Sequence, residues 1–318
     1  MRRSDATNLL RRIVRPLLPG VKRASVPAPG ARRWGIGIYA GASPWQLVPV
    51  AGARNPVLTS AHVHDVPASL VADPFMLRSE GRWYMFFEVF SRRAHRGQIG
   101  LATSKDGLRW RYARIVLAEP FHLSYPYVFE WAGERYMIPE TGAAGAVRLY
   151  RARRFPDEWQ FVGSLLQGEG LVDASIFRVH DAWWMFVETS HPPRHDTLRL
   201  FGADRLEGPW REHRCSPIVA GDPRRARPAG RVVVANGRIV RFAQDCERDY
   251  GMAVRAFEVE ELGVDRYAER PLGPEPVLTG SGVGWNAGGM HHVDAHRRPA
   301  GDWIACVDGW AITAVATG

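Results

Sequence analysis

Three stretches of the chain repeat the same order of polar, apolar and turn-forming positions. They span residues 71–88, 123–140 and 171–188, and their counterpart positions 73, 125 and 173 are 52 and 48 residues apart. Each has a short polar start, an apolar-rich run, a turn, one or two aromatic residues, a methionine, two further apolar residues and a glutamate. Self-similarity at a nearly fixed period is typical of a repeat architecture.

Each repeat predicts a β-hairpin whose two strands are joined by a two-residue turn. The expected turns are Glu80-Gly81, Ala132-Gly133 and His180-Asp181. The register that follows from them places Asp73 opposite Glu88, Tyr125 opposite Glu140, and Asp173 opposite Glu188. Opposite residues share a face and lie ~4.5–5.5 Å apart at the backbone. Two of the three hairpins should therefore carry a carboxylate pair at their open end.

The strands are apolar on both alternating faces, which indicates sheets that are buried on both sides. Two weaker copies follow, over residues 227–245, with a strong Asn236-Gly237 turn signal, and over 291–308. About five antiparallel sheets of this kind predict an all-β fold, a five-bladed β-propeller. We expect a strand over residues 34–39 to pair within the last blade and close the ring, which removes exposed edges.

The repeat resembles the five-bladed propellers of glycoside hydrolase families 43 and 32/68 in its Asp73-Pro74 strand and in the inter-strand turn sequences at 104–110 and 208–210. A closer resemblance is to the N-terminal propeller domain of plant glucosamine inositolphosphorylceramide transferases and its stand-alone bacterial relatives. The words that carry it are Val71-Ala-Asp-Pro-Phe-Met76, Met137-Ile-Pro-Glu-Thr141, Val172-Asp-Ala-Ser-Ile-Phe177 and Met290-His-His-Val-Asp294. It covers about residues 34–310, and implies a propeller with a carbohydrate role.

The charge of the chain changes the picture of its N-terminus. Residues 1–33 hold nine basic side chains and one acid, whereas the rest of the chain has 33 basic and 32 acidic residues. The folded part is nearly neutral, so we expect no nucleic-acid partner. We predict a basic, flexible segment at 1–33 and the propeller at 34–318. Leucines and arginines alternate in pairs over 9–18, which fits either an amphipathic anchor on an anionic membrane or a disordered leader.

The three cysteines, an odd number with no C-x-x-C spacing, argue against a disulfide framework and against a zinc site. No apolar run reaches the ~18–20 residues of a membrane-spanning helix. We therefore expect a cytoplasmic protein, peripheral to the inner membrane if residues 1–33 bind it.

The first residues of the innermost strands of a propeller ring one mouth of its channel. Here they are Asp73, Tyr125, Asp173, Arg227, His291 and His292. Carboxylates, an aromatic ring, a cation and imidazoles together are the chemistry of a sugar site. By the resemblance, Asp73 is the catalytic base or nucleophile and Asp173 the auxiliary carboxylate. The general acid would be a glutamate, with Glu188 the first choice and Glu140 the second.

Other interpretations of the glutamates and of Arg227 remain open. A glutamate that recurs at the same place in every hairpin, as Glu88, Glu140 and Glu188 do, often has an architectural role. Arg227 would hold an anionic group of the ligand or form a salt bridge to Asp173 or Glu188.

The two adjacent histidines would donate hydrogen bonds to a sugar or pack in the core. Because neighbours on a strand point to opposite faces, His291 and His292 should not share one metal ion. We expect no cofactor, although the resemblance brings in a Ca²⁺ near the last-blade histidine of several related propellers. The glycine-rich loop 280–289 should let Trp285 and Asn286 approach a ligand.

The sequence thus favours a glycosidase-like protein that hydrolyses or transfers a glycosyl unit in envelope polysaccharide biosynthesis or glycolipid metabolism. The alternative is a non-catalytic module that binds a glycan or glycolipid and assists a partner glycosyltransferase. Two carboxyls ~5–10 Å apart around an open pocket would support hydrolysis. Carboxylates that are all buried in hydrogen bonds between blades would support the binding module. A third reading, a scaffold for protein partners, needs an exposed apolar patch on the channel face.

Overall fold

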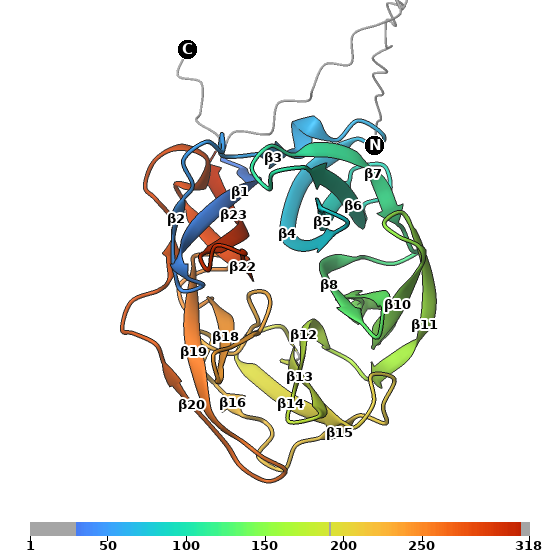
Figure 1. Ribbon diagram of the computed structural model, residues 1–318, viewed down its shortest axis with the longest axis vertical. Helices are drawn as coiled ribbons and strands as arrows, with labels where there is room; N and C mark the ends of the chain where they lie inside the picture. Colours follow the sequence, from blue (N-terminus) through green and yellow to red (C-terminus); the bar gives the residue numbers. More distant parts are fainter. Residues whose placement is uncertain (1–29, 191, 313–318) are drawn as a thin grey trace, which may run out of the picture.

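A computed structural model describes residues 30–190 and 192–312 and contains five antiparallel sheets around a central axis (Figure 1). Blade one contains β4 (Ala68–Ser79), β5 (Arg82–Ser91), β6 (Arg96–Ser104) and β7 (Arg111–Leu117). Blade two contains β8 (Ser124–Trp131), β9 (Glu134–Glu140), β10 (Ala146–Arg154) and β11 (Glu158–Gln167). Blade three contains β12 (Val172–Val179), β13 (Ala182–Glu188), β14 (Thr197–Ala203), β15 (Arg211–Glu212) and β16 (Val219–Ala220).

Blades four and five complete the ring. Blade four contains β17 (Val233–Ala235), β18 (Arg238–Asp245), β19 (Ala253–Leu262), β20 (Tyr267–Pro271) and β21 (Leu278–Thr279). Blade five contains β22 (Gly289–Arg297), β23 (Trp303–Ile312), β1 (Arg32–Ser43), β2 (Gln46–Pro49) and β3 (Leu58–Thr59). The described helices are three short 3₁₀ turns, η1 (Ser60–His62), η2 (Gly142–Ala144) and η3 (Gly284–Asn286), and none could cross a membrane. The predicted five-bladed propeller is therefore confirmed.

The first strand closes the ring, as predicted. β1 pairs with β23 through ten register positions, from Arg32↔Ile312 to Gly41↔Trp303. Because β1 begins at Arg32, the last two residues of the predicted basic segment belong to blade five. Residues 1–29 of the 1–33 segment lie outside the described residues, and so do residues 313–318 of the predicted propeller domain.

The hairpin turns occur at the predicted positions, but the register at the open ends differs by one residue. Glu88 pairs with Ala72 and not with Asp73, because a β-bulge interrupts the ladder between Ala72 and Phe75. The same bulge places Glu140 opposite Ser124 and Glu188 opposite Val172. The residue after each of these pairs is left-handed, with φ +52° at Asp73, +44° at Tyr125 and +51° at Asp173. A bulge re-aims a side chain, and here it turns all three out of the ladder.

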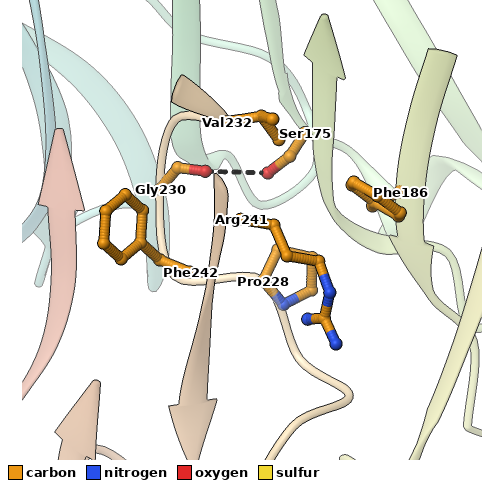
Figure 2. Close-up of a pocket in the computed structure, with 7 residues that line it drawn as sticks. All are labelled: Ser175, Phe186, Pro228, Gly230, Val232, Arg241 and Phe242. Atoms are coloured by element: carbon orange, nitrogen blue, oxygen red, sulfur yellow. Dashed lines mark hydrogen bonds between the residues drawn. The ribbon is translucent and has the colours of Figure 1, made fainter. Parts of the chain in front are cut away.

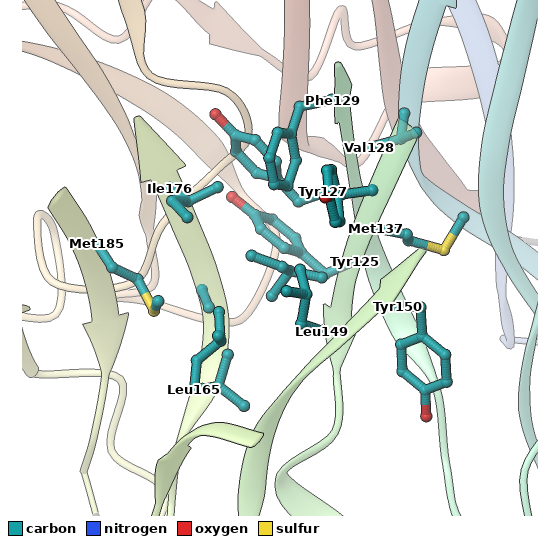
Figure 3. Close-up of a cluster of buried hydrophobic side chains, with 14 of the residues drawn as sticks. Tyr125, Tyr127, Val128, Phe129, Met137, Leu149, Tyr150, Leu165, Ile176 and Met185 are labelled. Atoms are coloured by element: carbon teal, nitrogen blue, oxygen red, sulfur yellow. The ribbon is translucent and has the colours of Figure 1, made fainter. Parts of the chain in front are cut away.

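The core fills the spaces between neighbouring blades. Figure 3 shows part of the largest cluster, in which Tyr125, Tyr127, Ile176 and Met185 pack between blades two and three. All four side chains are buried. Each such burial contributes ~1.5–3 kcal/mol, so adjacent blades hold each other in fixed relative positions.

Two side chains cross the axis and fill the channel. The Tyr125 hydroxyl of blade two accepts the Gly230 N–H of blade four at 2.6 Å, and lies 2.7 Å from the Ser175 hydroxyl of blade three. Arg231 donates to Asp294 of blade five at 2.5 Å and to the Val128 carbonyl of blade two at 2.7 Å. These contacts join blades two to five at the axis.

Candidate functional site

The bulged residue Asp73 is the centre of a buried polar cluster between blades one and five. Its Oδ1 lies 3.7 Å from His291 Nε2 and 3.9 Å from His292 Nδ1. Its Oδ2 accepts the backbone N–H of Tyr125 at 3.3 Å. Both histidines therefore approach one carboxylate, contrary to the expectation that they face opposite ways. The reason is a second bulge, between Gly289 and His292, which breaks the alternation of side chains along β22.

Asp308 on β23 completes this cluster and was not among the residues predicted from the sequence. Its Oδ1 lies 2.6 Å from His291 Nδ1, and its Oδ2 accepts the backbone N–H of Asp73 at 2.8 Å. Its side chain is fully buried. A signal was present, since Asp308 is a lone acid inside the apolar run 303–310, and a carboxylate buried in such a strand needs partners.

Asp173, the second predicted carboxylate, is held by blade four. Arg227 Nε donates to Asp173 Oδ2 at 2.7 Å, and Gln244 Nε2 donates to the same oxygen at 3.2 Å. Of the two open interpretations of Arg227, the salt bridge to Asp173 is the one present. The Asp173 Oδ1 atom is buried and has no hydrogen-bond partner among the described residues.

Aromatic and imidazole rings cover the cluster. Tyr250, from the β18–β19 loop, lies under the Arg227 guanidinium at 5.1 Å and meets the His291 ring edge-on at 5.2 Å. His195 Nδ1 lies 3.0 Å from Arg227 Nη1, and Trp34 packs against His291 at 4.4 Å. Tyr250 and His195 are half-buried, whereas the carboxylates beneath them are buried. The sequence of these loops carried no signal for either residue.

Two of the three repeated glutamates share one structural role. Glu140 Oε1 accepts the backbone N–H of Gly142 at 2.6 Å, and Glu188 Oε1 accepts that of Ser190 at 2.8 Å. Each thus caps the turn that follows its strand. Glu88 instead lies 3.5 Å from the His122 imidazole.

Burial keeps several of these carboxyl groups protonated to unusually high pH. It raises the pKa of Asp73 to about 7, with His291 opposing the shift and Asp308 adding to it. It also raises the pKa of Glu140 to about 7, with the charge of Asp173 adding to the shift, and raises that of Glu188. Burial lowers the pKa of His292 to about 4. The site therefore holds carboxyls that can exchange protons near neutral pH.

The cluster offers a poor cage for the Ca²⁺ that the resemblance brings in. Ligating atoms of Asp73, His291 and Asp308 lie within 4.8 Å of one another. Calcium takes 6–8 oxygen ligands. Here one of three donors is an imidazole, and both Asp308 oxygens already accept N–H groups. We derive no step through a cation.

The last two predicted residues pack inside blade five instead of beside Asp73. Asn286 is buried, and its amide donates to the Tyr39 hydroxyl at 3.2 Å. The Trp285 ring lies against the backbone of Gly37, where an added Cβ would come within 2.7 Å of it. The contacts of these two side chains are thus packing contacts within blade five. Their contact with a ligand stays a prediction.

A crevice between blades three and four lies beside the axis (Figure 2). Ser175 donates to the Gly230 carbonyl across it at 3.0 Å, with Phe186 and Arg241 on its wall. It has no room for a water molecule, so it is a packing seam and not a ligand site.

Residues 29–310 match the family model described as glucosamine inositolphosphorylceramide transferase 1, N-terminal. A curated relative from Oryza sativa subsp. japonica, named glucosamine inositolphosphorylceramide transferase 1, is 35% identical over 92% of this chain and 42% of its own length. The Arabidopsis thaliana protein of that name is 33% identical over 88% of this chain and 39% of its own length. The chain thus spans about two fifths of these plant relatives. They give no support to the bacterial origin that the resemblance suggested.

Solved structures share the fold at low sequence identity. The α-L-arabinanase of Cellvibrio cellulosa complexed with arabinohexaose is 19% identical, with a TM-score of 0.55 over 77% of this chain and 91% of that one. The catalytic domain of the Coprinopsis cinerea GH62 α-L-arabinofuranosidase is 12% identical, with a TM-score of 0.58 over 90% and 100%. The chain therefore shares the five-bladed propeller fold with these proteins, and it belongs to the family of the N-terminal domain of glucosamine inositolphosphorylceramide transferase 1.

Proposed function

We propose that the cluster around Asp73 and Asp173 acts on a glycosyl unit of a carbohydrate or glycolipid. The observation that carries this proposal is the contrast between two neighbouring carboxyls. Asp73 has a pKa raised to about 7 by burial, whereas Asp173 is ion-paired with Arg227. A pair of carboxyls in different environments, one desolvated and one ion-paired, is the pattern of acid–base catalysis at a glycosidic bond.

The roles follow from the contacts of each side chain. Asp73 is the base that takes a proton from the attacking water, or the nucleophile. Asp173 uses its unpartnered Oδ1 to hold a sugar hydroxyl. The raised pKa of Glu140, about 7, reverses the order expected from the sequence, so that Glu140 donates a proton to the leaving oxygen and Glu188 becomes the second choice. A group whose pKa lies near the working pH is the most effective proton donor or acceptor.

The test is cleavage of a panel of aryl furanosides and pyranosides by the wild type and Asp73→Asn. Asparagine tolerates the left-handed backbone at this position, so the variant should keep its fold. We expect cleavage to fall ~10²–10⁴-fold. The matched control is Asp302→Asn, at the exposed turn of the β22–β23 hairpin. No cleavage by any folded protein on the whole panel would contradict the hydrolase.

A second candidate is a non-catalytic module that binds a glycan or glycolipid for a partner glycosyltransferase. Three observations favour it: Asp73, Asp173 and Asp308 are buried in hydrogen bonds between blades, blade four supplies Arg227 where an acid would serve, and Glu140 and Glu188 cap backbone turns. In that case glycan-array binding should be measurable and should weaken in Asp173→Asn, with no cleavage by either protein.

The setting of this activity is also a proposal. The relatives are named as transferases of a glycolipid, which supports a glycolipid substrate and a transferase partner. We propose a cytoplasmic location, with the basic residues of the 1–33 segment in contact with an anionic membrane. Sedimentation with anionic and neutral vesicles, for the full chain and for a chain lacking residues 1–29, tests that contact.

A further inference from the structure

We infer that Asp308 is a positioning residue that fixes the tautomer of His291 and the backbone of Asp73, so that the protonation of each of these two side chains depends on that of the other. The inference rests on the proposed function, in which Asp73 transfers a proton. Asp308 belongs to β23, at the end of the fifth and weaker copy of the repeat.

The first step of the argument is the contact set of Asp308. Its Oδ2 accepts the Asp73 N–H at 2.8 Å, across the boundary between blades five and one. Its Oδ1 lies 2.6 Å from His291 Nδ1 and accepts the His291 backbone N–H at 3.4 Å. Asp73 has φ +52°, a conformation that non-glycine residues adopt only when their surroundings enforce it. The bond to its N–H is one such restraint.

The second step concerns the imidazole. An ionised Asp308 only accepts hydrogen bonds, so His291 Nδ1 must carry the proton that lies between them. Its other nitrogen, Nε2, then faces Asp73 Oδ1 at 3.7 Å. Trp34 and Tyr250 pack against the ring at 4.4 and 5.2 Å, and they prevent it from rotating. The geometry therefore directs Nε2 at Asp73.

The third step is the charge that faces this pair. The carboxyl groups that face this pair are Asp308 on β23 and Asp173 on β12, and the facing cation is Arg227, which pairs with Asp173. His292 on β22 is the neighbouring imidazole, and Tyr250 brings a phenol from the β18–β19 loop. Burial lowers the pKa of His291, but the adjacent Asp308 outweighs it and the net shift is upward. At 3.7 Å the two groups are coupled through their charges, so that a proton on His291 favours ionised Asp73 and a neutral His291 favours protonated Asp73.

The experiment is an NMR titration of ring-labelled histidines in the full chain. His291→Gln identifies the His291 signal by its loss. In the wild type at high pH, the neutral ring should be the Nδ1–H tautomer. In Asp308→Asn, the pKa of His291 should fall so that its proton affinity drops roughly tenfold or more, one pKa unit being tenfold. Asp302→Asn is the control and should leave the His291 titration unchanged.

Two outcomes would overturn the inference: a neutral His291 with its proton on Nε2, or an unchanged His291 titration in Asp308→Asn. The first needs only the wild type, so the inference stays testable if the variant fails to fold. Where an aryl glycoside is cleaved, Asp308→Asn should also shift the acidic limb of the pH–rate profile. An inactive wild type with the expected titration would reject the proposed function alone.

Discussion

Arg227 of blade four donates its Nε proton to Asp173 of blade three over 2.7 Å, and the Asp173 side chain is only 2% exposed. Removing Arg227 would leave a buried carboxylate without its cation. Arg227→Ala should therefore lower the free energy of unfolding by roughly 3–5 kcal/mol. Urea unfolding followed by tryptophan fluorescence measures this loss.

The matched control is Arg224→Ala, three residues away. Arg224 pairs with Asp222 at 3.2 Å, but the arginine side chain is 51% exposed. Solvent screens such pairs, so the control should cost ~1 kcal/mol or less. An Arg227→Ala variant as stable as Arg224→Ala would show that the buried pair does not hold blades three and four together.

The sequence was sufficient for the fold because the repeat carries its own turns. The Asn236-Gly237 and Glu80-Gly81 pairs both adopt positive φ in two-residue turns, as hairpin chemistry requires. The one-residue register error had a physical origin. Asp73, Tyr125 and Asp173 have a left-handed backbone although they are not glycine. The conformational preferences of these residue types do not predict it.

Part of the site could be predicted because the predicted fold determines which strand ends lie close together. Asp73, Asp173, Arg227 and the two histidines meet as expected, because the ring brings strand starts together. Tyr250 and His195 come from loops between strands, and their approach depends on how the loops fold over the mouth. Trp285 and Asn286 pack around Gly37 and Tyr39, because glycine-rich loops also permit close backbone packing, and their contact with a ligand stays a prediction.

The raised pKa of Glu140 predicts a dependence of stability on pH. Glu140 keeps its proton in the folded chain up to about pH 7, whereas the usual value is 4.5. Between these values folding takes up a proton, so the contribution of Glu140 to stability falls as the pH rises. Glutamine is neutral at every pH and can still accept the Gly142 N–H. Glu140→Gln should therefore gain stability relative to the wild type between pH 5 and pH 8.

The gain is at most roughly 3 kcal/mol, since each pKa unit is worth 1.36 kcal/mol. Thermal unfolding at the two pH values measures it, with Glu158→Gln as the control, because the Glu158 side chain is half exposed. A difference between Glu140→Gln and the wild type that stays constant with pH would contradict a protonated Glu140.

The hydrogen bonds of the Tyr125 hydroxyl indicate that its removal should lower the free energy of unfolding. It lies 2.7 Å from Ser175 Oγ, donates to the Gly230 carbonyl and accepts the Gly230 N–H. Tyr125→Phe keeps the packed ring but leaves a buried N–H unpaired, at a cost of ~1–3 kcal/mol. Tyr84→Phe, at a half-buried ring of blade one, is the control. Equal urea midpoints for the two variants would mean that the axial contacts do not stabilise the ring.

The third hairpin turn predicts a stabilising substitution. His180 and Asp181 have φ +53° and +61°, whereas the corresponding second positions of three other hairpin turns are Gly81, Gly133 and Gly237. A left-handed non-glycine residue costs ~1–2 kcal/mol. Asp181→Gly relieves that strain, and it loses only an ion pair to Arg178 whose aspartate side chain is 95% exposed. We expect a net gain of ~0.5–1 kcal/mol in the free energy of unfolding, because the glycine also increases the entropy of the unfolded chain.

Asp181→Ala removes the same ion pair without relieving the strain, so it should not be stabilising in the same urea titration. If both variants unfold at the same urea concentration, the gain does not come from the left-handed backbone.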